Sequence, residues 1–235
     1  MTVTVRRLAF TPPRDRSRQA APQVFEHLRE RIIALELPPG TVLSRQELQL
    51  QFGLSSTPIR DALMKLAEEA LVDVFPQHAT VVSRIDLDHA RQAAFLRRSI
   101  EVEVVHNLAS RPDPALLDKL RQNLRQQQDL AENGDLMEFN AVDRAMHRMM
   151  YDAAGVPDLW TVMLKRNGHI ERLRRLHLPM KGKVDQTIRD HSAIMDAIAA
   201  GDPEAAAREV RAHLSRSLSF IESIRAHYPA DYFRD

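Results

Sequence analysis

Three histidines and one aspartate occupy positions of the sequence that otherwise carry apolar side chains at helical spacing. Asp143 and His147 lie four residues apart, so they project from the same face of a helix. His191 and His213 stand within similar apolar stripes of two later segments. Because a buried carboxylate without a partner is costly, we expect these inward-facing side chains to bind a cation together.

Imidazole nitrogen and carboxylate oxygen are ligands that suit zinc, nickel, manganese or iron(II). Four such ligands on an octahedral ion would leave two positions open for water or for the carboxylate of a small molecule. Two alternatives fit the same residues. The histidines can be inert core residues of a bundle that only dimerises, or a bound metal can activate water for hydrolysis. No general base is evident beside them, so an enzyme is not expected.

Helical patterns from about residue 87 onward would position these four side chains. Proline and glycine separate the patterns, as is typical of helix ends. The predicted helices span residues 87–110, 113–132, 135–154, 157–178, 182–200 and 203–227. Helices of this number and length predict a compact all-α domain.

One of these predicted helices contains a segment dense in cations, residues 165–175. Runs of charge usually face water, so Arg172, Arg174 and Arg175 are expected to form a solvated face and are left out of the metal set. His169, in the same segment, is a candidate for lining a ligand pocket.

Residues 46–71 contain a second pattern, in which two short helices are predicted on either side of a tight turn. Gly53 can adopt the positive φ that ends the first helix, and Ser55 or Ser56 can cap the second. Polar residues, Arg60 among them, lie opposite the apolar face of the second helix. This pattern is typical of a helix-turn-helix whose second helix enters the major groove. A plain αα-hairpin is the alternative.

After Leu71 the pattern changes to that of two short strands around a turn. The strands are expected near residues 72–75 and 80–82, with His78 at the tip of the turn. His78 is a candidate for contact with DNA, and an exposed turn histidine without a role is the alternative.

The composition agrees with two small domains. The chain has 235 residues, with 44% hydrophobic residues and seven glycines, which suits a helical protein. No apolar run could span a bilayer, no signal segment is evident, and cysteine is absent, so a cytoplasmic protein without disulfides is expected. The net charge of +1 does not indicate a nucleic-acid partner by itself, but residues 1–19 carry five arginines and predict a mobile basic arm.

Residues 24–82 resemble the DNA-binding head of the GntR family of winged-helix regulators. Such heads share a Pro-Gly-x-x-Leu lead-in, a Glu-Leu pair, a Gly-Val-Ser-Arg-Thr-Pro-Val-Arg-Glu-Ala-Leu core and a Gly-Leu-Val step into the wing. The corresponding residues are Pro39-Gly40-Thr41-Val42-Leu43, Glu47-Leu48, Gly53-Leu54-Ser55-Ser56-Thr57-Pro58-Ile59-Arg60-Asp61-Ala62-Leu63 and Ala70-Leu71-Val72. Turn, polar and apolar residues agree in register, so the match is specific.

The resemblance implies contacts with double-stranded DNA from a set of polar residues in the two helices and the wing. This set is Arg45, Ser55, Ser56, Thr57, Arg60 and His78. The sequence departs from the family pattern at three contacts. Ser56 stands where arginine is usual, Gln46 where arginine is frequent, and His78-Ala79 replaces an Arg-Gly wing tip. The operator sequence is therefore expected to differ from those of other members.

Residues 90–227 resemble the FCD ligand-binding domain of the FadR-like branch of the same family. Many members place a metal on an aspartate, a histidine four residues later, a histidine before an Ala-Ile step and a histidine in the last helix. The matching segments are Asp143-Arg-Ala-Met-His147, Asp190-His191-Ser-Ala-Ile and Arg211-Ala-His213-Leu214. The resemblance implies an antiparallel bundle of six or seven helices that holds zinc, nickel or manganese on Asp143, His147, His191 and His213.

Arg97 matches a pocket arginine of that domain and is expected to bind an anionic effector. An ion pair with Glu101, four residues later, is the alternative. The prediction is a mainly α protein, with a winged helix-turn-helix and small two-stranded wing at residues 20–84. A helical domain for ligand binding and dimerisation is expected at residues 85–235. The expected function is a homodimeric transcriptional repressor, in which a small organic acid on the metal shifts the population of DNA-binding conformations.

Overall fold

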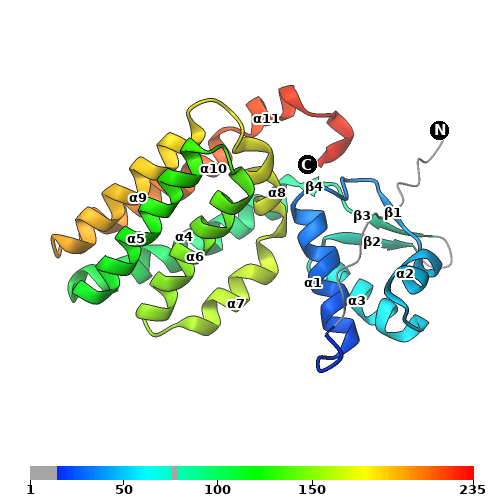
Figure 1. Ribbon diagram of the computed structural model, residues 1–235. Helices are drawn as coiled ribbons and strands as arrows, with labels where there is room; N and C mark the ends of the chain where they lie inside the picture. The colour runs from blue at the N-terminus through cyan, green and yellow to red at the C-terminus, as the bar shows by residue number, and fades with distance from the viewer. Residues whose placement is uncertain (1–14, 76–78) are drawn as a thin grey trace. The chain divides into compact units, whose positions relative to one another are not determined.

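The computed structural model describes residues 15–75 and 79–235. The chain divides into two compact units. Among the described residues, the first unit comprises 15–90 together with 227–235, and the second comprises 91–226. The first contains a small sheet and the second is helical, so the predicted mainly α fold class is confirmed (Figure 1). No helix of the described chain is both long and apolar enough to cross a membrane.

The first unit has the order of elements expected for a winged helix-turn-helix. Its elements are α1 (Ala20–Ile33), β1 (Val42–Leu43), α2 (Arg45–Phe52), α3 (Ser56–Glu68), β2 (Val72–Phe75) and β3 (Ala79–Val82). The three strands form an antiparallel sheet in the order β1-β3-β2. The sequence predicted the two wing strands but not β1, in which Val42 pairs with Val81.

Backbone geometry explains the tight turns of this unit. Gly53 ends α2 with a φ of 61°, as predicted, so α3 can start three residues later. Ser55 is the N-cap residue of α3, although its side chain makes no capping hydrogen bond. Ala70 adopts a φ of 56° at the step from α3 into the wing, a conformation that favours glycine. Leu28, Leu48 and other apolar side chains from the three helices and the sheet share one buried cluster.

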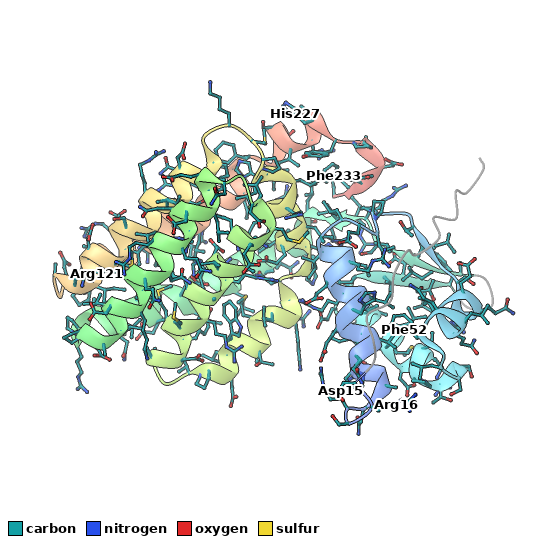
Figure 2. The ribbon with its side chains drawn as sticks, viewed as in Figure 1. Asp15, Arg16, Phe52, Arg121, His227 and Phe233 are labelled. Atoms are coloured by element: carbon teal, nitrogen blue, oxygen red, sulfur yellow. The ribbon has the colours of Figure 1, made fainter. Side chains whose placement is uncertain are left out.

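A further short strand follows the wing. β4 (Ile85–Asp86) pairs in parallel with β5 (Phe233–Arg234), from the far end of the chain. Phe233 is buried, and its position is labelled in Figure 2. Arg234 contacts two carboxylates, with Nε 3.1 Å from Asp86 Oδ2 and Nη1 3.7 Å from Asp73 Oδ1. The C-terminal residues therefore belong structurally to the first unit.

The second unit is a bundle of long helices. Its elements are α4 (Leu87–Ser110), whose first residues lie in the first unit, α5 (Pro114–Glu132), α6 (Leu136–Ala153), α7 (Pro157–Arg166), α8 (Gly168–His177), α9 (Lys183–Ala199), α10 (Pro203–Ser219) and α11 (Ile221–His227). The predicted helix 157–178 is divided at Asn167, which both ends α7 and precedes α8. The Asn167 amide donates to Glu171 Oε1 at 3.0 Å, so a side chain stabilises the new helix start.

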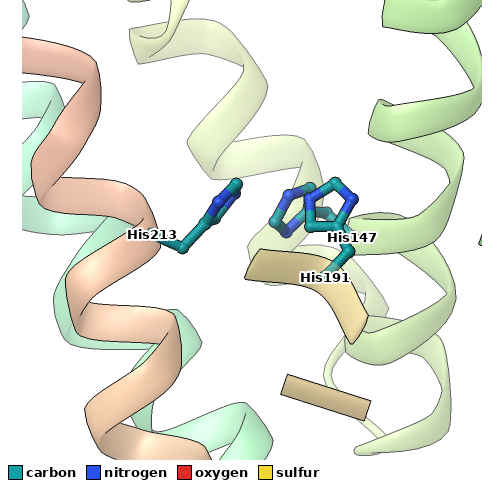
Figure 3. A group of neighbouring side chains, drawn as sticks. All are labelled: His147, His191 and His213. Carbon is teal, nitrogen blue, oxygen red and sulfur yellow. The ribbon is translucent and has the colours of Figure 1, made fainter. Parts of the chain in front are cut away.

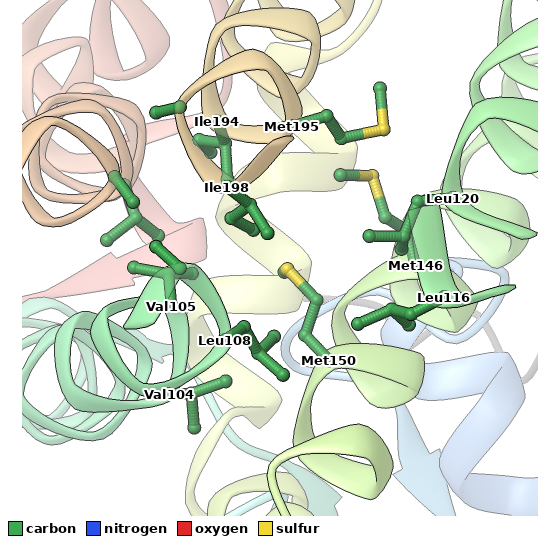
Figure 4. Close-up of a cluster of buried hydrophobic side chains, with 14 of the residues drawn as sticks. Val104, Val105, Leu108, Leu116, Leu120, Met146, Met150, Ile194, Met195 and Ile198 are labelled. Atoms are coloured by element: carbon green, nitrogen blue, oxygen red, sulfur yellow. The ribbon is translucent and has the colours of Figure 1, made fainter. Parts of the chain in front are cut away.

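The core of the bundle holds the helices that carry the candidate site. Met146 and Met150 of α6 point towards Ile194 and Ile198 of α9 (Figure 4). Leu120 of α5 belongs to the same cluster. The helix α9 packs on both α5 and α10, and α5 packs on α6. Side chains on the inner faces of these helices are therefore held in fixed positions.

Candidate metal centre and DNA-binding face

The described residues predicted to contact DNA lie on the surface of the first unit. These are Arg45, Ser55, Ser56, Thr57 and Arg60, all of which are exposed. Ser56 and Thr57 form the first turn of α3, and Arg60 follows one turn later. The first turn of α3 carries no acidic residue, so its backbone amides suit a phosphate. His78 lies outside the described residues.

Arg60 is the cation on this face that is best placed to reach DNA. Its side chain is 64% exposed and lies 3.4 Å from Asp61 Oδ1, a weak contact that leaves the guanidinium accessible. Arg60 shares the outward face of α3 with Thr57 and Met64, at spacings of three and four residues. Pro58 and Ile59 face the other way, and Ile59 is fully buried. The face required of a recognition helix is thus present.

In the second unit the three predicted histidines converge. His147 from α6, His191 from α9 and His213 from α10 each offer a nitrogen within 4.8 Å of the other two (Figure 3). The ring centroids of His191 and His213 are 4.7 Å apart, and each lies 5.5 Å from that of His147. All three side chains are buried. The distant helix α6 and the consecutive helices α9 and α10 therefore form one cluster of imidazoles.

Each histidine has an oxygen atom close to its Nδ1. His147 Nδ1 lies 2.8 Å from Glu101 Oε2, and His191 Nδ1 lies 2.8 Å from Gln127 Oε1. His213 Nδ1 lies 3.3 Å from Asp190 Oδ2. Carboxylate and amide oxygens only accept hydrogen bonds, so they favour the tautomer with hydrogen on Nδ1. In that tautomer the lone pair is on Nε2, which is the arrangement that a metal ligand needs.

Hydrogen bonds between two side-chain amides fix the orientation of Gln127, the partner of His191. Gln127 Nε2 donates to Asn123 Oδ1 at 2.7 Å, and Asn123 Nδ2 donates to the carbonyl oxygen of Val142 at 3.0 Å. Both amide nitrogens are therefore occupied as donors, and Gln127 Oε1 is left to accept from His191. Gln127 is fully buried, so water does not compete for this contact. Gln127 was not predicted as a partner, because a glutamine within a polar run of the sequence gives no signal of such a role.

Asp143, the fourth predicted ligand, is fully buried beside the histidines but is not one of the three converging groups. Its Oδ2 accepts a hydrogen bond from Arg174 Nη2. Its Oδ1 lies 3.5 Å from His191 Nε2. In the described part of the chain, Asp143 Oδ1 and the Nε2 atoms of His147 and His191 are buried without a hydrogen-bond partner. A cation would satisfy all three atoms, so the residues fit a divalent metal.

The expectation that Arg172 and Arg174 face water is wrong, and Arg175 is half-buried. Arg172 is fully buried, with Nη2 2.9 Å from His169 Nδ1. Arg174 is 13% exposed and contacts both Asp143 and Glu171. Buried carboxylates offset the cost of burying this guanidinium, which is why the run of cations does not form a surface. The segment is instead part of the surroundings of the histidine cluster.

Arg97 is buried and forms an ion pair with Glu101, at 2.6 Å between Nε and Oε1. The other oxygen of Glu101 is the one beside His147. The structure thus shows the ion pair that was the alternative to effector binding. Arg97 holds Glu101, and Glu101 in turn faces His147.

The electrostatic environment keeps the cluster ready for a cation. Burial lowers the pKa of His213 to about 4, and burial together with His213 lowers the pKa of His191 well below its ordinary value. Burial alone would raise the pKa of Asp143, but Arg174 and the nearby histidines outweigh it and hold this pKa well below the ordinary range. At neutral pH these imidazoles are uncharged and the carboxylate is ionised, which are the protonation states of metal ligands.

Comparison with known proteins agrees with both halves of the structure. Residues 20–82 match the bacterial regulatory proteins of the gntR family, and residues 92–216 match the FCD domain. The chain belongs to the GntR family of transcriptional regulators, with an FCD domain as its second unit. Members of this family are regulators and not enzymes, so the hydrolase alternative is set aside.

Relatives match over nearly their whole length. An HTH-type transcriptional regulator from an unstable DNA locus of Streptomyces ambofaciens is 37% identical, over 90% of this chain and 89% of that protein. The HTH-type transcriptional repressor RspR of Escherichia coli is 28% identical, over 91% of this chain and 93% of its own. The structure of E. coli McbR/YncC aligns with a TM-score of 0.74 at 20% identity, covering 90% of this chain and all of that one.

Proposed function

We propose that this GntR-family regulator is a repressor whose FCD domain holds one divalent metal ion and binds a small carboxylate effector. The observation that carries the proposal is the convergence of His147, His191 and His213, each with an oxygen atom close to Nδ1. Zinc, nickel and manganese suit such a set of nitrogen ligands. The free Oδ1 of Asp143 would supply the fourth ligand.

The metal would act as an anchor for an anion. An octahedral divalent ion with four protein ligands has two positions left for water or for a carboxylate. The residues around it keep their roles, with Glu101, Gln127 and Asp190 orienting the rings and Arg174 holding the carboxylate of Asp143. The assignment of Arg97 to the effector would require its ion pair with Glu101 to open.

Regulation would follow from a shift between conformations. A ligand that binds one packing of the bundle more tightly favours that packing, and this alters the fit of the heads to DNA. We propose that the protein acts as a homodimer in the cytoplasm, because two recognition helices suit a palindromic operator. Repression is supported by the name of the E. coli relative, a repressor that matches along most of this chain.

Metal content tests the proposal directly. The full-length protein is stripped with a chelator, reloaded with zinc, nickel or manganese, and measured by inductively coupled plasma mass spectrometry. We expect about one equivalent in the wild type, almost none in His191→Ala, and an unchanged value in His106→Ala, a control outside the cluster. Equal metal in the His191 and His106 variants would show that the ion, if bound, lies elsewhere. No metal in the wild type would leave a bundle that only dimerises.

A further inference from the structure

The charged side chains around the histidine cluster balance one another. Seven of them contact a histidine directly or through one or two partners in the described structure, and Lys183 interacts electrostatically with the group. The carboxylates are Glu101, Asp143, Glu171 and Asp190, and the cations are Arg97, Arg174, Lys183 and Arg216. Four negative and four positive charges cancel. Because imidazoles bind a metal in their neutral form, a divalent ion would leave two positive charges without compensation in a buried place.

Lys183 is the cation in this group without a carboxylate of its own. Arg97, Arg174 and Arg216 each form an ion pair, and Arg216 binds both oxygens of Asp190. Within the described part of the chain, the Lys183 ammonium has neither an ion pair nor a hydrogen bond. Lys183 and Asp190 are two helical turns apart on α9, so both side chains extend from the face that also adjoins His191.

Arg174 and Arg216, two cations that interact electrostatically with Lys183, are both partly exposed. Glu101, Asp143 and His147 are completely buried. By contrast, Arg174 is 13% exposed and Arg216 is 36% exposed. Lys183 is half-buried, and burial together with Arg174 lowers its pKa to about 8, so it is still mainly charged at pH 7. The partly exposed groups around the cluster therefore include one cation without an ion pair.

We propose, resting on the metal site proposed above, that Lys183 makes the regulator selective for a small dicarboxylate, with one carboxylate on the metal and the other on the Lys183 ammonium. Such a ligand carries the two negative charges that the metal-loaded cluster lacks. A buried excess of charge is costly, so a monocarboxylate would leave part of that cost unrelieved. Lys183 would thus determine the class of effector while taking no part in holding the metal.

Calorimetric titration of the zinc-loaded, full-length protein with succinate and with butyrate tests this role. The two acids have the same number of carbons and differ by one carboxylate. We expect the wild type to bind succinate roughly tenfold or more tightly than butyrate, as one charge-assisted hydrogen bond would give. Lys183→Met should bring the two affinities within about threefold, chiefly by weakening succinate. Lys183→Arg, which keeps the charge, should preserve most of the preference.

Lys181→Met is the matched control, because Lys181 is exposed and lies two residues before Lys183, in the turn that precedes α9. It should behave as the wild type, and zinc content, measured first, should be equal in all variants. Equal affinities for the two acids in the wild type, no binding of succinate, or a preference that survives Lys183→Met would each overturn the inference and leave the metal site standing. A wild type that holds no zinc would overturn the metal site and the charge argument together.

Discussion

Replacing Gln127 with methionine would remove the acceptor that orients His191 while keeping a long side chain in the core. In the native structure Gln127 Oε1 lies 2.8 Å from His191 Nδ1, which favours hydrogen on that nitrogen. Without this acceptor, the remaining oxygen near the ring is Asp143 Oδ1, 3.5 Å from His191 Nε2. The neutral ring would then favour hydrogen on Nε2 and donate it to Asp143. The nitrogen required by the metal would be blocked.

The expected loss of metal affinity follows from the hydrogen bond that must be broken when the metal binds. Restoring the ligating tautomer would sacrifice the new contact to Asp143 and leave Nδ1–H without an acceptor, a penalty of about 1–3 kcal/mol. This corresponds to roughly a 10- to 100-fold loss of metal affinity, the range typical of outer partners of metal ligands. Asn123 would also lose the donor to its Oδ1, so the metal-free variant should unfold at a lower temperature than the wild type.

The assay is a competition for zinc between the protein and a chromophoric chelator, after circular dichroism has shown that the variant is folded. Gln126→Met is the control, since Gln126 is the exposed neighbour of Gln127 on the same helix. We expect the control to bind zinc as the wild type does. If the folded Gln127 variant bound zinc as tightly as this control, the argument from tautomers would be refuted. A metal ligand other than His191 would then have to be sought.

Three further results are expected. Arg60→Ala should weaken operator binding in a gel shift by roughly 10- to 100-fold, as loss of a base or phosphate contact does, whereas Arg121→Ala on the bundle should not. Ala70→Gly should raise the free energy of unfolding by up to about 1 kcal/mol in a urea titration, because φ is 56° there, and a lower value would contradict the assigned strain. The pKa of His213 is about 4 in the folded protein and 6.5 in the unfolded chain. The free energy of unfolding of the metal-free protein should therefore fall by up to about 3 kcal/mol as the pH is lowered from 6.5 to about 4. His213→Gln should flatten that part of the stability profile, and an unchanged slope would show that His213 is not buried as a neutral ring.

The local parts of the structure were predictable from sequence because local forces decide them. The spacing of Asp143 and His147 followed from helical periodicity, and the predicted helix limits near Pro114 and Pro203 agree closely with the structure. Gly53 marked the turn between the two short helices because its left-handed conformation favours glycine. Such signals depend on neighbours within a few residues.

The partners of the cluster depend on packing between segments far apart in sequence, which periodicity does not reveal. Asp143 and Arg174 are 31 residues apart, and Gln127 and His191 are 64 apart. Arg174 lies in a run of charges that has the composition of a surface. Its burial becomes intelligible only once Asp143 of α6 and Glu171 of α8 are both seen to contact its guanidinium. The sequence therefore indicated the converging histidines more readily than the groups beside them.

The pairing of β4 with β5 means that the first unit is discontinuous in the chain. Asp86 and Arg234 are 148 residues apart, and the whole bundle is inserted between them. During synthesis the winged head leaves the ribosome first, but the strand partner and the buried Phe233 arrive only with the last residues described. Closing so long a loop is slow compared with forming the local helices. The head consequently reaches its complete structure only after the helical bundle has been made.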